Sequence, residues 1–136
     1  MNTIFTIENQ QSISLPEFVL SLIQISNQAV LLHWQAKFYN EHIILGQFYD
    51  SFNDLMDSLV ESIIGKCGDD CMSFDQANIV VYDYSRSREK FFELIEDCLG
   101  TVFPTLFNES TDSELYSIVD DILVLTNRTK YLLNLR

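Results

Sequence analysis

Apolar residues recur along the chain at intervals of three and four, the spacing that places side chains on one face of an α-helix. Four segments show this pattern, and polar or glycine-containing stretches separate them. The pattern predicts an all-α fold, a four-helix bundle in a single domain over residues 1–136, with residues 1–13 as an N-terminal extension. The side chains expected to meet in its core are Phe18, Leu22, Ile25, Leu55, Leu59, Phe91, Ile118 and Ile122.

The first half of the chain predicts a helical hairpin. Ser14 and Glu17 have the spacing of a capping box, so the first helix is expected to begin there and to end near Lys37. The second helix is expected to follow Asn40, a good N-cap residue, and to stop at Gly65. Only a few residues join these two helices, so they should lie antiparallel.

The second half predicts another hairpin. The third helix is expected after the cap Ser85, and Gly100 and Pro104 should disturb its end. The fourth is expected to start at a capping box over residues 111–114. Residues 66–84 then form a long crossover between the hairpins, and two antiparallel hairpins joined in this way have the connectivity of ferritin-like four-helix bundles.

The crossover is not a featureless linker. Residues 79–82 read Ile-Val-Val-Tyr, a β-like apolar run, and a short helix is expected near residues 74–77. We therefore expect the crossover to pack against the helices.

Charge narrows the possible partners. The chain has 8 Lys and Arg against 20 Asp and Glu, a net charge of −12. Affinity for nucleic acid comes mainly from cationic side chains that neutralise phosphates, so direct binding to nucleic acid is not expected. Residues 1–12 contain no Lys or Arg, and polar residues interrupt every apolar stretch before about 18 positions, so neither a signal peptide nor a membrane span is expected.

The three cysteines, Cys67, Cys71 and Cys98, are an odd set, which argues against a disulfide framework and favours a reducing cytoplasm. Cys67 and Cys71 are also candidates for a soft-metal site. A zinc site needs four ligands, however, and no His or Cys pair follows nearby.

The candidate chemistry lies at the first hairpin. His33 stands near the end of the first helix and His42 in the first turn of the second, so a short turn should bring the two imidazoles together. The second helix also carries an acidic stripe at spacings of four, three and four. Imidazoles with carboxylates suit iron or another first-row divalent metal. The alternative is a pair of structural histidines beside a solvated acidic face. The stripe consists of Asp50, Asp54, Asp57 and Glu61.

The spacing of these residues constrains any metal site. Val30 and Tyr39 stand three positions before His33 and His42, so the Glu-x-x-His motif of bundle di-iron sites is absent and that intrachain site is excluded. Fifteen positions separate His42 from Asp57, about 22 Å along a helix, which is too far for one metal. If histidines and carboxylates share a site, it must form between two chains, and a two-fold dimer would form it twice.

The segment from Leu32-His33-Trp34-Gln35-Ala36-Lys37 through His42 to Asp57-Ser58-Leu59-Val60-Glu61 resembles the Dps-type mini-ferritins. That family has a His-Trp pair at the end of its first helix, and a second His and an Asp-x-x-x-Glu pair on its second. The resemblance implies a ferroxidase site between two-fold-related subunits, with His33 and His42 from one and Asp57 and Glu61 from the other. It also implies a dimer that assembles into hollow dodecamers, and iron as the metal that is bound, oxidised and stored.

The motifs His-Trp-Gln, Tyr-x-x-His, Phe-Tyr-Asp and Gly-Lys, with the ending Tyr131-Leu132-Leu133-Asn134-Leu135, resemble an uncharacterised ferritin-like family of large DNA viruses and phages. This resemblance covers most of the chain. It implies the fold and a viral setting, with the host cytoplasm or the virion as the location and a viral or host protein as a partner.

The chain departs from the mini-ferritin pattern at one expected ligand. An acidic residue should follow four positions after the second His, but Gly46 stands there. Asp50, one turn later and about 6 Å further along the helix, is the candidate replacement. The basic tail of DNA-coating members is also missing. Two hypotheses therefore remain. In the first, the protein is a mini-ferritin that binds and oxidises iron. In the second, it is a catalytically degenerate bundle with a structural or interaction role, as a virion component or a binder of a host factor.

Overall fold

The structure, a computed structural model, describes residues 3–5 and 13–135. The described chain is mostly helical, which confirms the all-α prediction. Its longest helices are α1, α2 and α5, and α3 is extended by the π-helical turn η2 and by α4. The bounds are α1 Leu15–Gln35, α2 Tyr39–Cys67, α3 Arg88–Asp97, η2 Cys98–Val102, α4 Phe103–Leu106 and α5 Ser113–Leu133.

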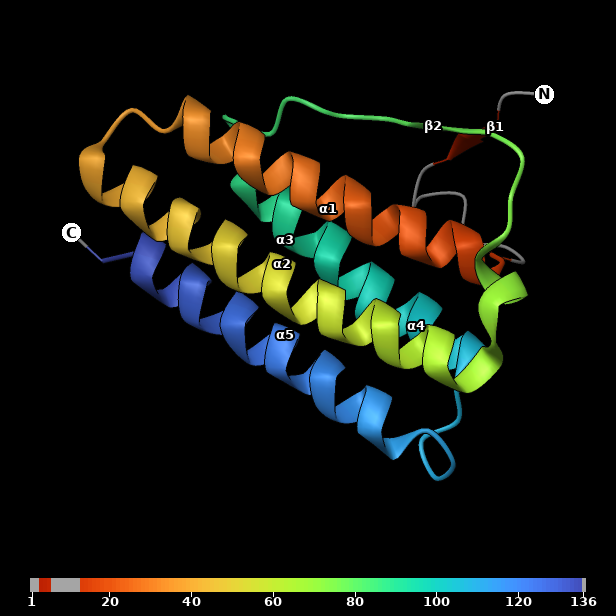
Figure 1. The fold of residues 1–136 in the computed structure, drawn as a ribbon. Coiled ribbons are helices and arrows are strands. Elements are labelled where there is room, and N and C mark those ends of the chain that lie inside the picture. The colour runs from red at the N-terminus through yellow and green to blue at the C-terminus, as the bar shows by residue number, and fades with distance from the viewer. Residues whose placement is uncertain (1–2, 6–12, 136) are drawn as a thin grey trace.

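The long helices lie side by side (Figure 1). α1 and α2 run in opposite directions, and α5 runs opposite to α3 and α2. The connection between α2 and α3 returns along α1, so that α2 and α3 run in the same direction (Figure 1). The end of the molecule that carries the α1–α2 turn therefore also carries the start of α3 and the C-terminal end of α5.

The N-terminus of α1 forms the predicted capping box. The backbone N–H of Glu17 donates to Ser14 Oγ at 3.3 Å, and the backbone N–H of Ser14 donates to Glu17 Oε1 at 3.2 Å. These two bonds satisfy backbone donors that the first turn of a helix leaves unpaired. The helix ends at Gln35, two residues before the predicted end.

By length and composition alone, α1 is apolar enough to cross a membrane. Of its most apolar 18-residue window, 56% is buried inside the structure, and the buried core helix of a soluble protein meets the same criterion. The hydropathy of α1 therefore does not decide between these two kinds of helix.

The boundaries predicted for α2 were wrong at both ends. The helix begins at Tyr39 with Phe38 as N-cap, before the expected cap Asn40. It continues through Gly65 to Cys67, and its C-cap is Gly68, whose φ of 91° only glycine adopts at little cost. The helix therefore stops at the second of two nearby glycines, where the backbone turns left-handed.

The predicted start of the third helix was wrong, whereas the disturbance predicted at its end is present as the π-helical turn η2. α3 begins at Arg88, because Ser85 donates instead to Asp83 and forms a turn before the helix. Gly100 lies within η2, whose wider turn lets the helix continue. Pro104 then stands in the first turn of α4, the part of a helix that best tolerates a residue without a backbone N–H.

The capping box predicted for the last helix does not form. The N-cap of α5 is Asp112, without a side-chain cap bond. Its carboxylate instead accepts from the backbone N–H of Asn108 at 2.8 Å and pairs with Lys66 at 2.7 Å. The N-cap is therefore Asp112 and not the expected Thr111, and its carboxylate is engaged by a tertiary ion pair and a loop contact.

The crossover packs against α1, as expected, although its elements differ from the prediction. The short helix is the 3₁₀ turn η1 (Asp69–Met72), not residues 74–77, and strand β2 (Ala77–Ile79) pairs in parallel with β1 (Thr3–Phe5). Gln24 Nε2 donates to Val80 O and Gln28 Nε2 to Tyr82 O, each at 2.8 Å. The two buried side-chain amides therefore give the extended segment hydrogen bonds of the kind that a neighbouring strand would provide.

The cysteine prediction was wrong for one pair. Cys67 and Cys71 form a disulfide, with their Cα atoms 6.0 Å apart across the turn at Gly68. The odd number of cysteines argued against a framework of several disulfides. It does not exclude a single disulfide between two cysteines that a local turn brings together. Cys98 is free and buried, and its burial raises the pKa of the thiol, so it stays protonated.

The predicted core is confirmed in most positions. Six of the eight side chains are buried, and Leu55 and Ile118 are partly buried and pack against the others. The six buried ones are Phe18, Leu22, Ile25, Leu59, Phe91 and Ile122.

Candidate metal centre

The α1–α2 hairpin brings the two histidines into direct contact. His33 lies in the last turn of α1 and His42 in the first turn of α2. Their rings stack, with centroids 3.8 Å apart and planes inclined by 18°. The short connection 36–38 produces this approach, as the sequence indicated.

Each histidine also bonds the backbone of the other. His33 Nδ1 lies 2.7 Å from His42 O, and His42 Nδ1 lies 2.9 Å from His33 O. A carbonyl oxygen can only accept, so both Nδ1 atoms must carry a proton. In the neutral side chains both Nε2 atoms then keep a lone pair. Histidines that bind metals use this arrangement, in which one nitrogen donates to a carbonyl and the other binds the ion.

Gly46 makes room for the His33 ring. A Cβ atom at this position would lie 3.0 Å from His33 Nδ1 and only 2.8 Å from His33 Cε1, and the second distance is closer than real Cβ atoms approach. The ring has no easy way to move, because its Nδ1 bonds a carbonyl and its face stacks on His42. The residue read as a missing acidic ligand therefore has a structural role, since any larger residue would displace His33.

An open groove of about 480 Å³ lies beside this pair. His33, Gly46 and Asp50 line it together with the exposed side chains of Trp34 and Ile43. Of the carboxylates in the acidic stripe, Asp50 is the one that shares this groove with a histidine. The candidate replacement ligand therefore borders the same groove as His33.

The other carboxylates lie elsewhere on the same helix. Asp54, Asp57 and Glu61 are exposed, and none of them has a hydrogen bond or ion pair within the described part of the chain. Among the described residues no three His, Cys, Asp or Glu side chains come close enough together to hold a metal ion. One chain therefore offers two imidazoles and, separately, two unpaired carboxylates at Asp57 and Glu61.

Sequence reasoning missed two features of this centre. One is the space that Gly46 provides, and the other is the reciprocal bonding of each Nδ1 to a carbonyl. A glycine one helical turn after His42 was the available signal for the first. The second depends on the shape of the turn, for which the sequence holds no distinct motif.

Comparison with known proteins gives a family but no activity. No curated protein and no solved structure matches the chain. One family model matches residues 33–133, which is more than half of the chain and includes both histidines. The chain therefore belongs to the family described as "Family of unknown function (DUF5856)".

Proposed function

We propose that this protein is a Dps-like mini-ferritin that binds Fe(II) at a site shared between two chains and oxidises it. The observation that carries the proposal is the histidine pair, in which both Nδ1 atoms donate to carbonyls, so that in the neutral rings each Nε2 keeps the lone pair that a metal would use. In this proposal His33 and His42 come from one chain, and Asp57 and Glu61 come from its two-fold mate.

The arrangement of the helices supports a ferritin-like bundle for this proposal. α1 with α2 and α3 with α5 form two antiparallel pairs, and the long connection along α1 joins them (Figure 1). This is the connectivity of ferritin-like bundles, which build metal sites from side chains on facing helices.

The need for a second chain follows from distance and exposure. His42 and Asp57 lie fifteen positions apart on the continuous helix α2, about 22 Å, so one metal cannot reach both. Asp57 and Glu61 are exposed and unpaired among the described residues, which leaves them free to face another molecule. The exposed Trp34 and Ile43 beside the histidines give an apolar rim that a mate would cover.

The residue types suit iron as the substrate. Neutral imidazoles and ionised carboxylates both bind Fe(II), and the two negative charges would stabilise Fe(III) after an electron passes to dioxygen or peroxide. The net charge of −12 would attract cations towards the protein. Asp50, in the groove beside His33, is the remaining candidate ligand.

A mixing experiment tests the shared site. A dimer of His42→Ala chains and a dimer of Glu61→Gln chains each have both sites damaged. When equal amounts are unfolded and refolded together, half of the dimers are mixed and each holds one intact site, so about a quarter of the native binding capacity should return. Calorimetry with Zn(II), and with Fe(II) under anaerobic conditions, measures that capacity.

The matched control is Glu93→Gln, which removes an exposed carboxylate from α3 and should not change metal binding. If the unmutated protein binds neither metal, or if the mixture binds no more than the separate variants, the shared site does not exist.

The alternative function is that of a degenerate bundle acting as an interaction protein. Trp34, Phe38 and Tyr39 are 70%, 65% and 79% exposed around the α1–α2 turn, as expected for a surface that binds another protein. A native particle that contains no iron after growth in iron-rich medium would favour this alternative, as a virion component or a binder of a host factor.

A further inference from the structure

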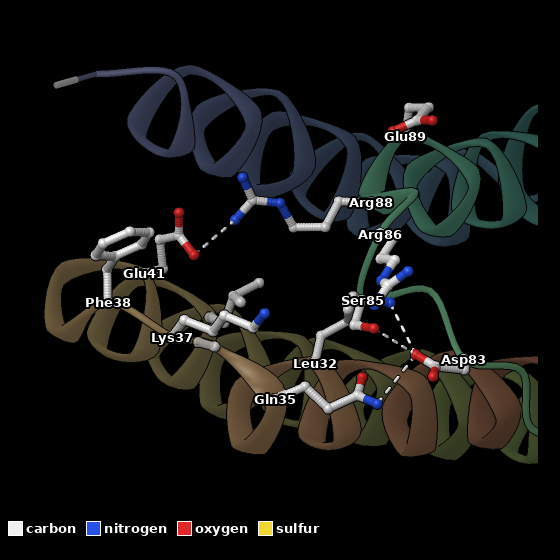
Figure 2. Close-up of a pocket in the computed structure, with 12 residues that line it drawn as sticks. Leu32, Gln35, Lys37, Phe38, Glu41, Asp83, Ser85, Arg86, Arg88 and Glu89 are labelled. Carbon is white, nitrogen blue, oxygen red and sulfur yellow. Dashed lines mark hydrogen bonds and ion pairs between the residues drawn. The ribbon is translucent and has the colours of Figure 1, made fainter.

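A second pocket lies on the other side of the α1–α2 turn and takes no part in the histidine pair. It has a volume of about 710 Å³ and lies between this turn and the segment 83–89 that leads into α3 (Figure 2). Leu32 and Leu45 give it a buried apolar base. Most of the remaining wall is polar or charged, and Ala36 and Phe38 complete it.

Three cations line this pocket in a chain that has only 8 Lys and Arg. Lys37 comes from the α1–α2 turn, Arg86 from the segment before α3, and Arg88 from the first turn of α3. Arg88 pairs with Glu41 at 3.3 Å, across the pocket (Figure 2). Lys37 has no hydrogen bond or ion pair to any residue that the structure describes. The ammonium group of Lys37 is therefore free to bind a ligand.

The carboxylates of the pocket are already occupied or directed elsewhere. Asp83 Oδ1 accepts from Ser85 Oγ at 2.7 Å, from Ser85 N at 3.0 Å and from Gln35 Nε2 at 3.0 Å. These bonds, with a smaller effect from the charge of Arg86, lower the pKa of Asp83. Glu41 is paired with Arg88, and Glu89 points away from Lys37 (Figure 2). The carboxylates therefore leave the cation of Lys37 uncompensated.

The same pocket contains a hydrogen-bond acceptor without a donor. Gln35 Oε1 is buried and has no partner, whereas its Nε2 bonds Asp83. Buried carbonyl groups are nearly always satisfied, so an exception indicates a missing partner. A ligand with an O–H or N–H group would supply that donor.

We propose that this pocket binds a small organic anion that carries a carboxylate or phosphate group and a neighbouring hydroxyl or amino group. The anionic group lies between Lys37 and Arg86, where cationic side chains give charge-assisted hydrogen bonds. The neighbouring donor bonds Gln35 Oε1, and the carbon skeleton rests on Leu32 and Leu45. This proposal does not depend on the iron site, which lies on other side chains.

Three probes test the proposal in calorimetric titrations of the whole protein. Malate has carboxylates and a hydroxyl group, succinate has the carboxylates alone, and glycerol 3-phosphate has a phosphate with hydroxyl groups. We expect malate to bind more tightly than succinate, because only malate offers a donor to Gln35. The rank of glycerol 3-phosphate against malate decides between phosphate and carboxylate as the anionic group.

Variants separate the pocket from general charge effects. Lys37 and Arg86 are exposed, so Lys37→Gln and Arg86→Gln should fold normally and lower the affinity by about tenfold or more, the loss expected for one charge-assisted bond. Lys90→Gln makes the same charge change on α3 outside the pocket and should leave the affinity unchanged. Gln35→Leu should remove the preference for malate over succinate.

Two results would overturn the proposal. One is the absence of binding by all three probes at millimolar concentration. The other is an equal loss of affinity in Lys90→Gln and Lys37→Gln, since that would indicate attraction to the surface as a whole.

Discussion

The His33 imidazole lies against the backbone of Gly46, one turn along α2 from His42, and the rest of the centre depends on that contact. With no side chain at Gly46, the ring can stack on His42 at 3.8 Å while its Nδ1 bonds a carbonyl of the next helix. Replacing Gly46 by an acidic residue would add a carboxylate and at the same time push the His33 ring away. A carboxylate at this position and the observed ring position are therefore mutually exclusive.

We predict that Gly46→Ala lowers metal affinity without unfolding the protein. The added Cβ would come within 2.8 Å of the His33 ring, so the ring must leave its stacked position and lose its bond to His42 O. Nuclear magnetic resonance of the imidazole protons and calorimetry with Zn(II) measure the two effects.

The control is Gly65→Ala in the same helix, where a Cβ has nothing within 4 Å. This control should leave metal binding intact and stabilise the fold by about 0.5–1 kcal/mol. Unchanged imidazole signals in Gly46→Ala would show that the ring has other room.

Individual residues also show which features of the site could be predicted from the sequence and which could not. The meeting of His33 and His42 follows from a short turn between two periodic segments, and that expectation was correct. The interpretation of Gly46 as a lost ligand was incomplete. The spacing of ligand residues shows that a carboxylate is missing at this position, but it does not show that the His33 ring occupies the space of a side chain there. The Cys67–Cys71 disulfide was missed for a similar reason, since a count of cysteines ignores the local turn at Gly68 that joins them.

At the scale of elements, the helices could be predicted but several of their ends could not. Apolar periodicity identifies α1, α2, α3 and α5, because burial of one face decides whether each helix forms. The position of a helix end depends on whether a single side chain caps the helix or bonds another partner. Asp112 illustrates this, because Lys66 and Asn108 take the carboxylate that a capping role would need. Similarly, η2 lets the helical path continue past Gly100.

Lys66 joins the end of α2 to the start of α5. It pairs with Asp112 at 2.7 Å and with Glu114, and it donates to Thr111 O at 3.0 Å. The hydrogen bonds to Lys66 lower the pKa of both carboxyl groups, and those to Asp112 and Glu114 raise the pKa of Lys66. This cluster connects the two hairpins at the end of the molecule opposite to the histidines.

We predict that Lys66→Met destabilises the protein at neutral pH but not in acid. A carboxyl group with a pKa lowered on folding adds stability above its unfolded pKa, and that stability is lost as the pH falls through the lowered folded value. The difference in denaturant midpoint between the parent and Lys66→Met should therefore shrink below the ordinary carboxyl range of about 4. Added salt should also reduce it, because the pairs are exposed. The control Lys90→Met removes a lysine that has no ion pair to any described residue, so it should show no such pH dependence. A difference between parent and Lys66→Met that stays constant from neutral to acid pH would assign the effect to packing of the lysine stem.

On the scale of the whole molecule, the cations are few, and three of those that the structure describes pair with carboxylates. Lys130 pairs with Glu96 at 3.0 Å, Arg88 with Glu41 at 3.3 Å, and Lys66 with two acids. The pocket that contains Lys37 is concave and has acidic residues in its wall. Such a pocket suits one small anion, whereas a DNA duplex needs a row of cations along a convex or grooved surface.

We therefore predict that the isolated protein does not retard duplex DNA at physiological salt. A protein gains affinity for DNA by neutralising phosphates and releasing counterions, and a net charge of −12 opposes the approach of the duplex. Five cations could have formed a basic patch. Arg88 and Lys130 pair with carboxylates, and Lys37 and Arg86 line the small pocket, which leaves Arg128 as a single cation without an ion pair to any described residue. Gel-shift experiments at low and at physiological salt measure this directly. Retardation that persists at physiological salt and weakens steeply as more salt is added would require a basic surface created by assembly, since residues 3–5 and 13–135 of the single chain do not provide one.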